Sequence, residues 1–453
     1  MSVKPTLRAG FIRTDITPDY PVSIIGYFNE RISEGVLDRL YLRAATIVLN
    51  EKKLLFLQID NCLIPNDDVE TIKNEISKLG KYHKDEILIF AIHTHTGPGL
   101  ANFYESIREE KYFEFLKSTI ISTAAKIEAD QEVTVHLAET SYPDLAYNRR
   151  SYMKDGSVAT NPPKQHPDRV KPEGPVDRKL RLISFHDQAE NLLGIFCNIS
   201  NHTDTVGDNL ISADWPGILE TEIQNALHSD IPVFTFIAPQ GNINHLDFES
   251  LEDQFGYPEA QRIGKEYAKH ALTALNMSKT IQVEDIDSEV LEIDIPPREF
   301  SSQQIVEAEN IIREAQQDDV KDEKLSADDI FAGNMVVKKL FAKNLLHFSA
   351  NKKDYYTLPL QVVRLGSIIF FAIPGEPFVE IGLELIKTAR EQYDYDMTFP
   401  IALANGYFGY IPMEENFPRG GYEVSTGIGN PLSRTAAQKI LDTFTGWMKA
   451  HKE

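Results

Sequence analysis

The sequence predicts an α/β fold in which a central mixed β-sheet is flanked by helices. Short apolar runs dominate the first 240 residues, and several are apolar at successive positions rather than at alternate ones. Such runs are typical of strands that are covered on both faces. Amphipathic segments long enough for helices lie between some of them. This succession of strands and helices indicates the α/β class.

The expected strands and helices follow one another along the first half of the chain. The apolar runs predict strands at 45–49, 54–60, 88–93, 180–185, 192–200 and 233–238. The segment 67–80 has an acidic start and a glycine stop, which predicts a helix, and 112–129 has a helical pattern as well. Residues 141–178 are rich in proline and charge and show little periodicity, so we expect a long ordered loop over the site.

The second half contains a polar block at about 299–355, which we interpret as a helical insertion. Ser301 or Ser302 is expected to cap its first helix, and the acidic stretch 318–329 is expected to be solvated. The last segment has Leu441, Phe444 and Trp447 at helical spacing, which predicts an amphipathic helix packed on the core. We expect a single domain over 1–453.

Composition and charge exclude several classes of partner. The chain has 42% hydrophobic and 25% charged residues and a formal net charge of -22. That charge repels nucleic acid and anionic lipid, and no basic patch is evident, so we expect a small-molecule substrate and no stable membrane association. Cys62 and Cys197 each lie in an apolar run and are expected to be buried thiols. With no signal-like or membrane-spanning stretch, the expected location is the cytoplasm, whereas the oligomeric state stays open.

Two histidines mark the end of one predicted strand, in "ILIFAIHTHTGPG" at 88–100. Residues i and i+2 of an extended segment point to the same face, so His93 and His95 can reach one point in space. Imidazole is a ligand that suits Zn²⁺. The pair is equally compatible with histidines that are hydrogen-bonded in a core.

Two further predicted strands end on ligand-type residues. His202 follows the apolar run 192–200, and Glu376 follows the run in "SIIFFAIPGEPF". Sites of open α/β sheets are built at the carboxyl ends of strands. Three strands that each deliver a ligand-type residue at this boundary favour a metal site.

The sequence resembles the neutral or alkaline non-lysosomal ceramidases. The resemblance rests on motifs that occur in the family's order and span most of the chain: "RAGFIRTDITP" (8–18), "GVLDRLYLRA" (35–44), "HTHTGPG" (93–99), "YNRRSY" (147–152), "NHTDTVGDNLISADWPG" (201–217), "IPGE" (373–376) and "ANGYFGYIP" (404–412). It implies the ceramidase catalytic-domain fold. The β-sandwich domain that follows it in full ceramidases is not expected here.

The resemblance also implies a catalytic Zn²⁺ and its ligands. Carried over by position, the ligands are His93, His202, Glu376 and Tyr410, although Tyr410 could instead be an aromatic residue beside the site. The active-site residues that do not bind the metal are implied to be His95, Arg149 and Tyr422. His95 is expected to orient a water or pass on its proton, and the other two to donate to an oxyanion or to a polar group of the substrate.

The sequence departs from the family at one position of the site. Ceramidases of the family carry a serine in a Gly-Asp-Val-Ser-Pro-Asn stretch, whereas here the stretch reads "PQGNINHLDF" with Asn244 in the serine's place. Asparagine cannot act as a nucleophile, but its amide can donate to a substrate oxygen. His245 and Asp247 could supply acid–base groups or be ordinary polar loop residues.

These observations predict a zinc-dependent hydrolase that cleaves an amide (N-acyl) or ester bond of a small soluble substrate. Asn148 and Asn244 are the expected substrate-binding residues. The wealth of polar donors in these motifs keeps open a metal-dependent hydrolase or lyase acting on a carbohydrate derivative. A true ceramidase and a catalytically inactive binding protein remain further alternatives.

Overall fold

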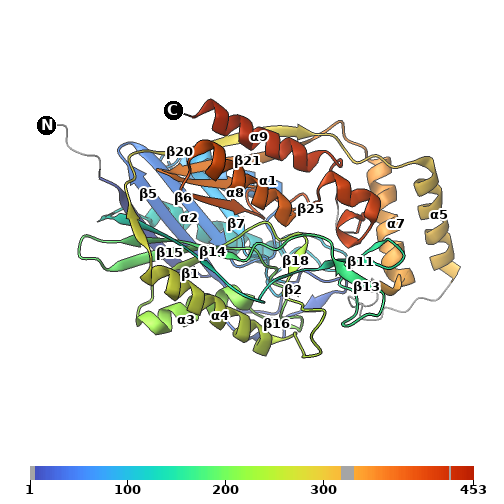
Figure 1. Ribbon diagram of the computed structural model, residues 1–453. Coiled ribbons are helices and arrows are strands. Elements are labelled where there is room, and N and C mark those ends of the chain that lie inside the picture. The colour runs from blue at the N-terminus through green and yellow to red at the C-terminus, as the bar shows by residue number, and fades with distance from the viewer. Residues whose placement is uncertain (1–5, 318–330, 428–429, 453) are drawn as a thin grey trace.

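Three mixed sheets form the body of the molecule in the computed structural model, which describes residues 6–317, 331–427 and 430–452 (Figure 1). The first has the order β7 (Ile87–Ala91), β6 (Lys52–Ile59), β5 (Tyr41–Leu49), β1 (Arg8–Asp15) and β8 (Gln131–Glu132). The second has the order β17 (Val233–Ile237), β15 (Leu192–Ile199), β14 (Lys179–His186), β9 (Thr134–Ser141) and β19 (Lys279–Ile281). The third has the order β20 (Ile286–Ile295), β21 (Tyr356–Leu365), β22 (Ile368–Ala372) and β24 (Met397–Ile401).

Each sheet contains one parallel pair of strands joined by a helix, and its other pairs are antiparallel. Helix α1 (Asn66–Lys78) connects β6 to β7, α3 (Asp214–Leu227) connects β15 to β17, and α8 (Val379–Tyr393) lies between β22 and β24. A parallel pair needs such a crossover because its two strands run in the same direction. The α/β class and the mixed pairing are therefore confirmed, with the strands divided among three sheets.

The core explains why the strand sequences are continuously apolar. Phe56 of β6, Phe196 of β15 and Phe370 of β22 meet between the sheets, with ring centroids 5.3 Å apart for Phe56–Phe196 and 5.4 Å for Phe56–Phe370. The alternate residues of β6, such as Leu55 and Leu57, belong to a second buried cluster that includes residues of the helices. Both faces of these strands are thus buried, and neither face can be polar.

Helices cover the outer faces of the sheets (Figure 1). Helix α2 (Glu110–Lys126) packs with α1, α4 (Tyr257–Asn276) with α3, and α9 (Ala436–Ala450) with α8. In α9 the stripe of Leu441, Phe444 and Trp447 is buried, as its spacing predicts. None of the helices in the described parts of the chain has the length and apolar character that a membrane span requires.

The predicted insertion contains two helices that pack on each other, α5 (Ser302–Gln317) and α7 (Met335–Ala350). The amide of Gln304 donates to the Ser301 hydroxyl at 3.2 Å, and the Gln304 side chain accepts from the Ser301 amide at 2.9 Å. This reciprocal pair caps the start of α5. The acidic stretch 318–329 lies outside the described residues.

Short strands and 3-10 turns complete the fold around the site. The strand pairs are β2 (Ser23–Ile24) with β3 (Arg31–Ile32), β4 (Gly35–Val36) with β16 (Leu210–Ile211), β10 (Tyr147–Asn148) with β18 (Ile243–Asn244), and β23 (Glu376–Pro377) with β25 (Tyr410–Ile411). The 3-10 turns are η1 (Lys84–Glu86), η2 (Glu414–Arg419) and η3 (Tyr422–Val424). The segment 141–178 is not the loop that was expected, since β11 (Arg150–Met153), β12 (Val158–Thr160) and β13 (Arg169–Pro172) form a small sheet there. Strands of three or four residues are too short to show a periodic pattern.

Candidate active site

The carboxyl ends of the parallel strands of all three sheets converge on one cavity. His93 and His95 follow β7, His202 follows β15, and Glu376 follows β22. Tyr410 comes after the end of β24. α/β sheets place their sites at the carboxyl ends of their strands, and here three sheets contribute such ends to one site.

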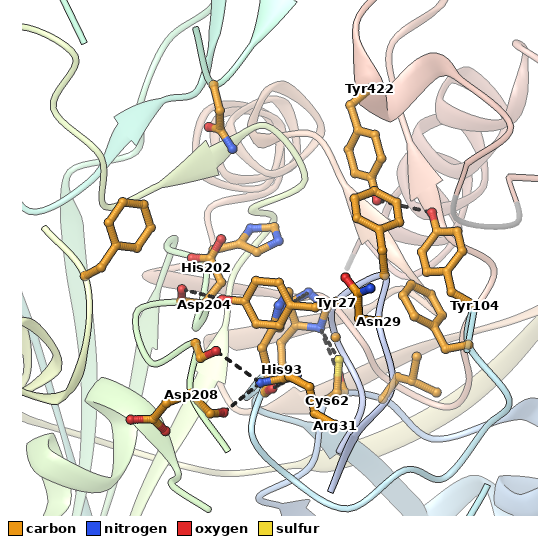
Figure 2. A pocket seen from close by; sticks show the side chains of 18 of the residues that line it. Tyr27, Asn29, Arg31, Cys62, His93, Tyr104, His202, Asp204, Asp208 and Tyr422 are labelled. Carbon is orange, nitrogen blue, oxygen red and sulfur yellow. Dashed lines mark hydrogen bonds between the residues drawn. The ribbon is translucent and has the colours of Figure 1, made fainter. Parts of the chain in front are cut away.

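His93, His202 and Glu376 form a compact group of metal-ligating type at the floor of this cavity, and Figure 2 labels the two histidines. Oε2 of Glu376 lies 3.2 Å from Nε2 of His93 and 3.2 Å from Nε2 of His202. All three residues are buried. A carboxylate and two imidazoles that point at one spot are a donor set that Zn²⁺ prefers.

The hydrogen bonds behind these three residues turn Nε2 of each histidine and Oε2 of Glu376 toward one another, where a cation could be held. Nδ1 of His93 donates to the Cys62 carbonyl at 2.9 Å, and Nδ1 of His202 donates to the Ile243 carbonyl at 2.9 Å. Each imidazole therefore presents the lone pair of Nε2 to the cavity, because a backbone carbonyl that accepts from Nδ1 fixes the tautomer and the ring orientation, as it does for metal-bound histidines. Oε2 of Glu376 is buried without a hydrogen-bond partner, as expected for an atom that binds a metal.

Tyr410 is brought beside this group by strand pairing. β23 and β25 are parallel, and Glu376 is directly opposite Tyr410 in their register. Directly paired residues point to the same face of a sheet, and both line the cavity. Burial raises the pKa of the Tyr410 phenol well above its usual value, and the Arg149 guanidinium partly opposes this effect.

His95 and Tyr422 lie on the cavity wall next to the three ligand-type residues. Nε2 of His95 is 3.3 Å from Nε2 of His93, while Nδ1 of His95 is buried and has no hydrogen-bond partner. The Tyr422 hydroxyl is 3.4 Å from the hydroxyl of Tyr104, the contact drawn in Figure 2. Both side chains can therefore approach a molecule held at the floor.

Arg149 is anchored from behind and turned toward the floor. Its Nε donates to Oε1 of Glu423 at 2.7 Å and its Nη2 to the Gly241 carbonyl at 2.7 Å. Nη1 lies 3.5 Å from Nε2 of His202. The free edge of the guanidinium thus faces the same spot as the three ligand-type atoms.

The two expected substrate-binding asparagines do not reach the cavity wall. The Asn148 amide donates to the Pro175 carbonyl at 3.1 Å and accepts from the Arg150 amide at 3.1 Å. Nδ2 of Asn244 donates to Oδ1 of Asn161 at 2.9 Å, and its Oδ1 accepts from the Leu246 amide at 3.1 Å. Both side chains are buried and satisfied within the chain, so the structure gives them a structural role.

Sequence reasoning missed residues that support the site. Tyr407 donates to Oε1 of Glu376 at 2.7 Å, and Glu423 holds Arg149. Tyr407 occurs in "ANGYFGYIP" three residues before Tyr410, and Glu423 directly follows Tyr422. This closeness in sequence to two predicted site residues was the only feature that could have indicated Tyr407 and Glu423. Cys62 is a free, buried thiol as expected, but it also lies at the cavity, with Sγ 3.6 Å from Nδ1 of His93.

The cavity above the floor has a volume of about 980 Å³ and a mixed lining. Aromatic rings and carboxylates are both well represented. The aromatic residues are Tyr27, Phe28, Phe103, Tyr104, Phe255, Tyr407, Tyr410 and Tyr422, and the acidic ones are Glu30, Glu34, Glu105, Asp204, Asp208 and Glu376. The cavity can therefore hold a small organic molecule with apolar and polar parts next to the candidate metal centre.

Known proteins are similar to this chain in sequence and in fold. Neutral ceramidase from Oryza sativa subsp. japonica is 27% identical over 238 residues, which are 48% of this chain and 28% of that protein. Neutral ceramidase from Pseudomonas aeruginosa is 21% identical over an alignment of 484 residues, which covers 96% of this chain and 71% of that protein. The chain thus aligns with little more than a quarter of the length of the rice relative.

The crystal structure of neutral ceramidase from Pseudomonas aeruginosa superimposes with a TM-score of 0.74 at 19% identity, covering 99% of this chain and 75% of that one. At this identity the likeness establishes the fold. The family model described as "Neutral/alkaline non-lysosomal ceramidase, N-terminal" matches residues 8–248, more than half of the chain and the part that carries both histidine motifs. The chain therefore belongs to the neutral/alkaline non-lysosomal ceramidase family.

Proposed function

We propose that this protein is a zinc-dependent hydrolase that uses water to cleave an amide, or an ester, bond of a small soluble compound. The observation that carries the proposal is the buried Oε2 of Glu376, which has no partner and faces Nε2 of His93 and of His202 at 3.2 Å. Membership of the family supports it, because the relatives are named neutral ceramidases. His93, His202, Glu376 and Tyr410 would hold the ion.

A bound Zn²⁺ supplies Lewis acidity, which polarises a carbonyl and makes a water acidic enough to act as a nucleophile near neutral pH. The chain's own residues provide the remaining functions. His95 has an unpartnered Nδ1 and an Nε2 beside His93, so it can take a proton and release it to the leaving amine. Arg149 and Tyr422 offer donors on the cavity wall to the oxygen on which negative charge develops.

The proposed substrate is a small N-acyl compound rather than ceramide itself, and the proposed location is the cytoplasm. Several lining carboxylates, among them Glu30, Glu105 and Asp208, are exposed where the cavity opens. Exposed charges of one sign favour a polar molecule over a lipid tail. Asn161 and Asn209, which also line the cavity, together with its aromatic rings favour a second candidate, a hydrolase or lyase acting on a carbohydrate derivative.

Metal analysis of the purified protein tests the proposal. We expect about one zinc per chain by elemental analysis, and its loss in His93→Ala and in Glu376→Ala together with all hydrolysis of N-acyl substrates. His136→Ala is the matched control, because His136 lies on β9 beside His186 and outside the cavity. A chain that does not bind zinc after incubation with it, or full hydrolysis by Glu376→Ala, would refute the proposed function.

A further inference from the structure

The cavity has two unlike sides. Phe28, Phe103, Tyr104 and Tyr422 form an aromatic wall, in which the Phe28 and Tyr104 ring centroids are 4.7 Å apart and those of Phe28 and Tyr422 are 6.3 Å apart. Glu34, Asp204 and Asp208 form what we call the acidic wall. Figure 2 shows Asp204 and Asp208 on the opposite side of the cavity from Tyr104 and Tyr422.

The acidic wall is a continuous structure held by local contacts. Nδ2 of Asn209 donates to Oε1 of Glu34 at 3.1 Å, which ties the β3–β4 segment to residues 208–210. Asp208 is next in the chain, and its carbonyl accepts from Nη1 of Arg31 at 2.9 Å. The Asp204 carbonyl accepts from the Tyr27 hydroxyl at 3.2 Å. These contacts fix the carboxylate of Glu34 and the backbone that carries Asp204 and Asp208.

The arginine side chains that line the cavity form no direct ion pair with Glu34 or Asp208. Among the described residues, the cavity is lined by two arginines and by no lysine. Arg149 is paired with Glu423, outside the cavity lining. The terminal nitrogens of Arg31 donate to the backbone carbonyls of Ile25, His95, Gly207 and Asp208. Arg31 therefore holds three loops together and forms no direct ion pair with any carboxylate that the structure describes, although its charge acts on the nearby Asp208 and partly offsets it.

Four carboxylates of the cavity remain without an ionic partner. Within the described residues, Asp204 is paired with His245 at 3.3 Å, whereas no ion pair involves Glu30, Glu34, Glu105 or Asp208. All four residues are exposed. They bring a net negative field to the opening of a cavity that is already marked as a site by the unpartnered Glu376 oxygen at its floor.

We propose that the amine half of the substrate carries a positive charge and lies against Glu34, Asp204 and Asp208. The inference rests on the proposed amide hydrolysis and names the class of compound, an N-acyl derivative of a diamine or of another amine with a cationic group. Glu34 and Asp208, which form no ion pair, attract an ammonium group and repel a carboxylate or phosphate, whereas Asp204 is already paired with His245 and contributes less. Hydrolysis of an amide also releases a carboxylate and an amine that becomes protonated at neutral pH, and this wall suits the second product.

Three amides with one acyl group test the charge preference. The benzoyl amides of ethylenediamine, ethanolamine and β-alanine differ mainly in the charge of the amine half, which is positive, zero and negative. We expect calorimetry on the zinc-loaded full chain to give an affinity for the cationic amide about tenfold above that for the neutral one at low ionic strength. The ratio should fall toward one at roughly 0.5 M salt, because exposed charges are screened.

Substitutions test whether the preference for the cationic amide arises at the acidic wall. The double variant E34Q/D208N should reduce the preference for the cationic amide to about twofold or less. The control E51Q/E284Q removes the same two charges from exposed positions outside the cavity and should leave the preference unchanged. Equal effects of both variants would show that the total charge of the chain causes the preference, which would overturn the inference.

Binding and turnover separate this inference from the proposed function. Preferential binding of the cationic amide without hydrolysis would support the acidic-wall assignment and refute the amidase proposal for this compound. Hydrolysis of all three amides without a difference in affinity or in KM would support the amidase proposal and refute the acidic-wall assignment. The assignment is also overturned if the cationic amide binds no more tightly than the anionic one, or does not bind at all.

Discussion

Tyr407 donates a hydrogen bond of 2.7 Å to Oε1 of Glu376, and the other oxygen of that carboxylate faces His93 and His202. The phenol occupies one oxygen and so fixes the rotation of the carboxylate. Oε2 is thereby aimed at the two imidazoles. The orientation of Glu376, the acidic member of the candidate ligand set, depends on Tyr407, which is not itself in that set.

Loss of this phenol should weaken metal binding. We expect Tyr407→Phe to reduce zinc affinity by about 10- to 100-fold, the range typical when a hydrogen-bond partner that orients a metal ligand is removed. Competition with a chromophoric chelator measures the change. Tyr82→Phe is the control, since Tyr82 is also buried but bonds to Thr46, outside the cavity. Equal zinc affinity of Tyr407→Phe and wild type would contradict the orienting role.

Glu423 should be required for both stability and activity. It accepts from Arg149, Arg150 and Thr160, each at 2.7 Å, and is fully buried. Glu423→Gln leaves the buried guanidinium of Arg149 without its counter-charge, while Arg150 keeps its ion pair with Glu173, so we expect a loss of about 3 kcal/mol in the free energy of unfolding. Because Arg149 loses its anchor, kcat should fall while KM and zinc content change little.

A second buried carboxylate provides the control for that change. Glu220 accepts from Nε of Arg43 at 3.0 Å and lies outside the cavity. Glu220→Gln should lower the urea midpoint to a similar extent without changing kcat. A parallel loss of kcat in both variants would mean that Glu423 acts through overall stability alone.

Lys73 makes the stability depend on pH. It is buried on α1, with Nζ 3.5 Å from Oε1 of Gln361, and burial lowers its pKa from 10.5 to about 7. Below pH 7 the side chain is protonated in both states, so the cost of burying the charge is fully present. Between pH 7 and 10.5 the unfolded chain binds more protons than the folded one, and the free energy of unfolding therefore rises with pH.

Replacement of Lys73 by methionine tests this linkage. At about pH 6, Lys73→Met should raise the free energy of unfolding by roughly 2 to 4 kcal/mol, and the gain should shrink toward zero as the pH approaches about 10. Urea unfolding at several pH values measures it. Lys78→Met, at an exposed position of the same helix, is the control and should change the free energy of unfolding only slightly. A constant gain for Lys73→Met would contradict the lowered pKa.

Asn244→Ser should not create ceramide hydrolysis. The resemblance to the family places a serine at position 244, but the Asn244 side chain found there is fully buried and bonds to Asn161 and to the Leu246 amide. A serine is too short to keep both bonds, so we expect a loss of about 1 to 2 kcal/mol of stability. Asn244→Asp keeps the acceptor for Leu246 and serves as a partial control. Cleavage of N-acyl-sphingosine by the serine variant would show that this position governs the substrate.

Much of the fold and of the floor of the site could be predicted because strand ends are readable in the sequence. His93, His202 and Glu376 each follow an apolar run, and parallel strands bring such positions to a common edge. The number of sheets could not be predicted. A continuous apolar run indicates that both faces of a strand are covered, but helix and sheet cover a face equally well, as Leu55 and Phe56 of β6 illustrate.

The supporting residues could not be predicted for a related reason. The bonds from Tyr407 to Glu376 and from Glu423 to Arg149 join segments 31 and 274 residues apart, and they depend on how separate sheets and loops dock. The expectation that Asn148 and Asn244 bind the substrate depended on the same unknown docking of loops, and neither side chain reaches the cavity lining. A polar residue near a motif can equally well satisfy backbone groups behind the wall, and both of them do so.

The division of the candidate ligands among three sheets has a consequence for assembly. His93, His202 and Glu376 each follow a strand of a different sheet, so a partly folded chain in which one sheet is undocked offers at most two of the three donors. A metal that needs all three binds the completed fold alone and shifts the folding equilibrium by mass action, whereas chelation removes that stabilisation. An ion bound there would link the three sheets to one another, and its release would indicate that one sheet has separated from the others.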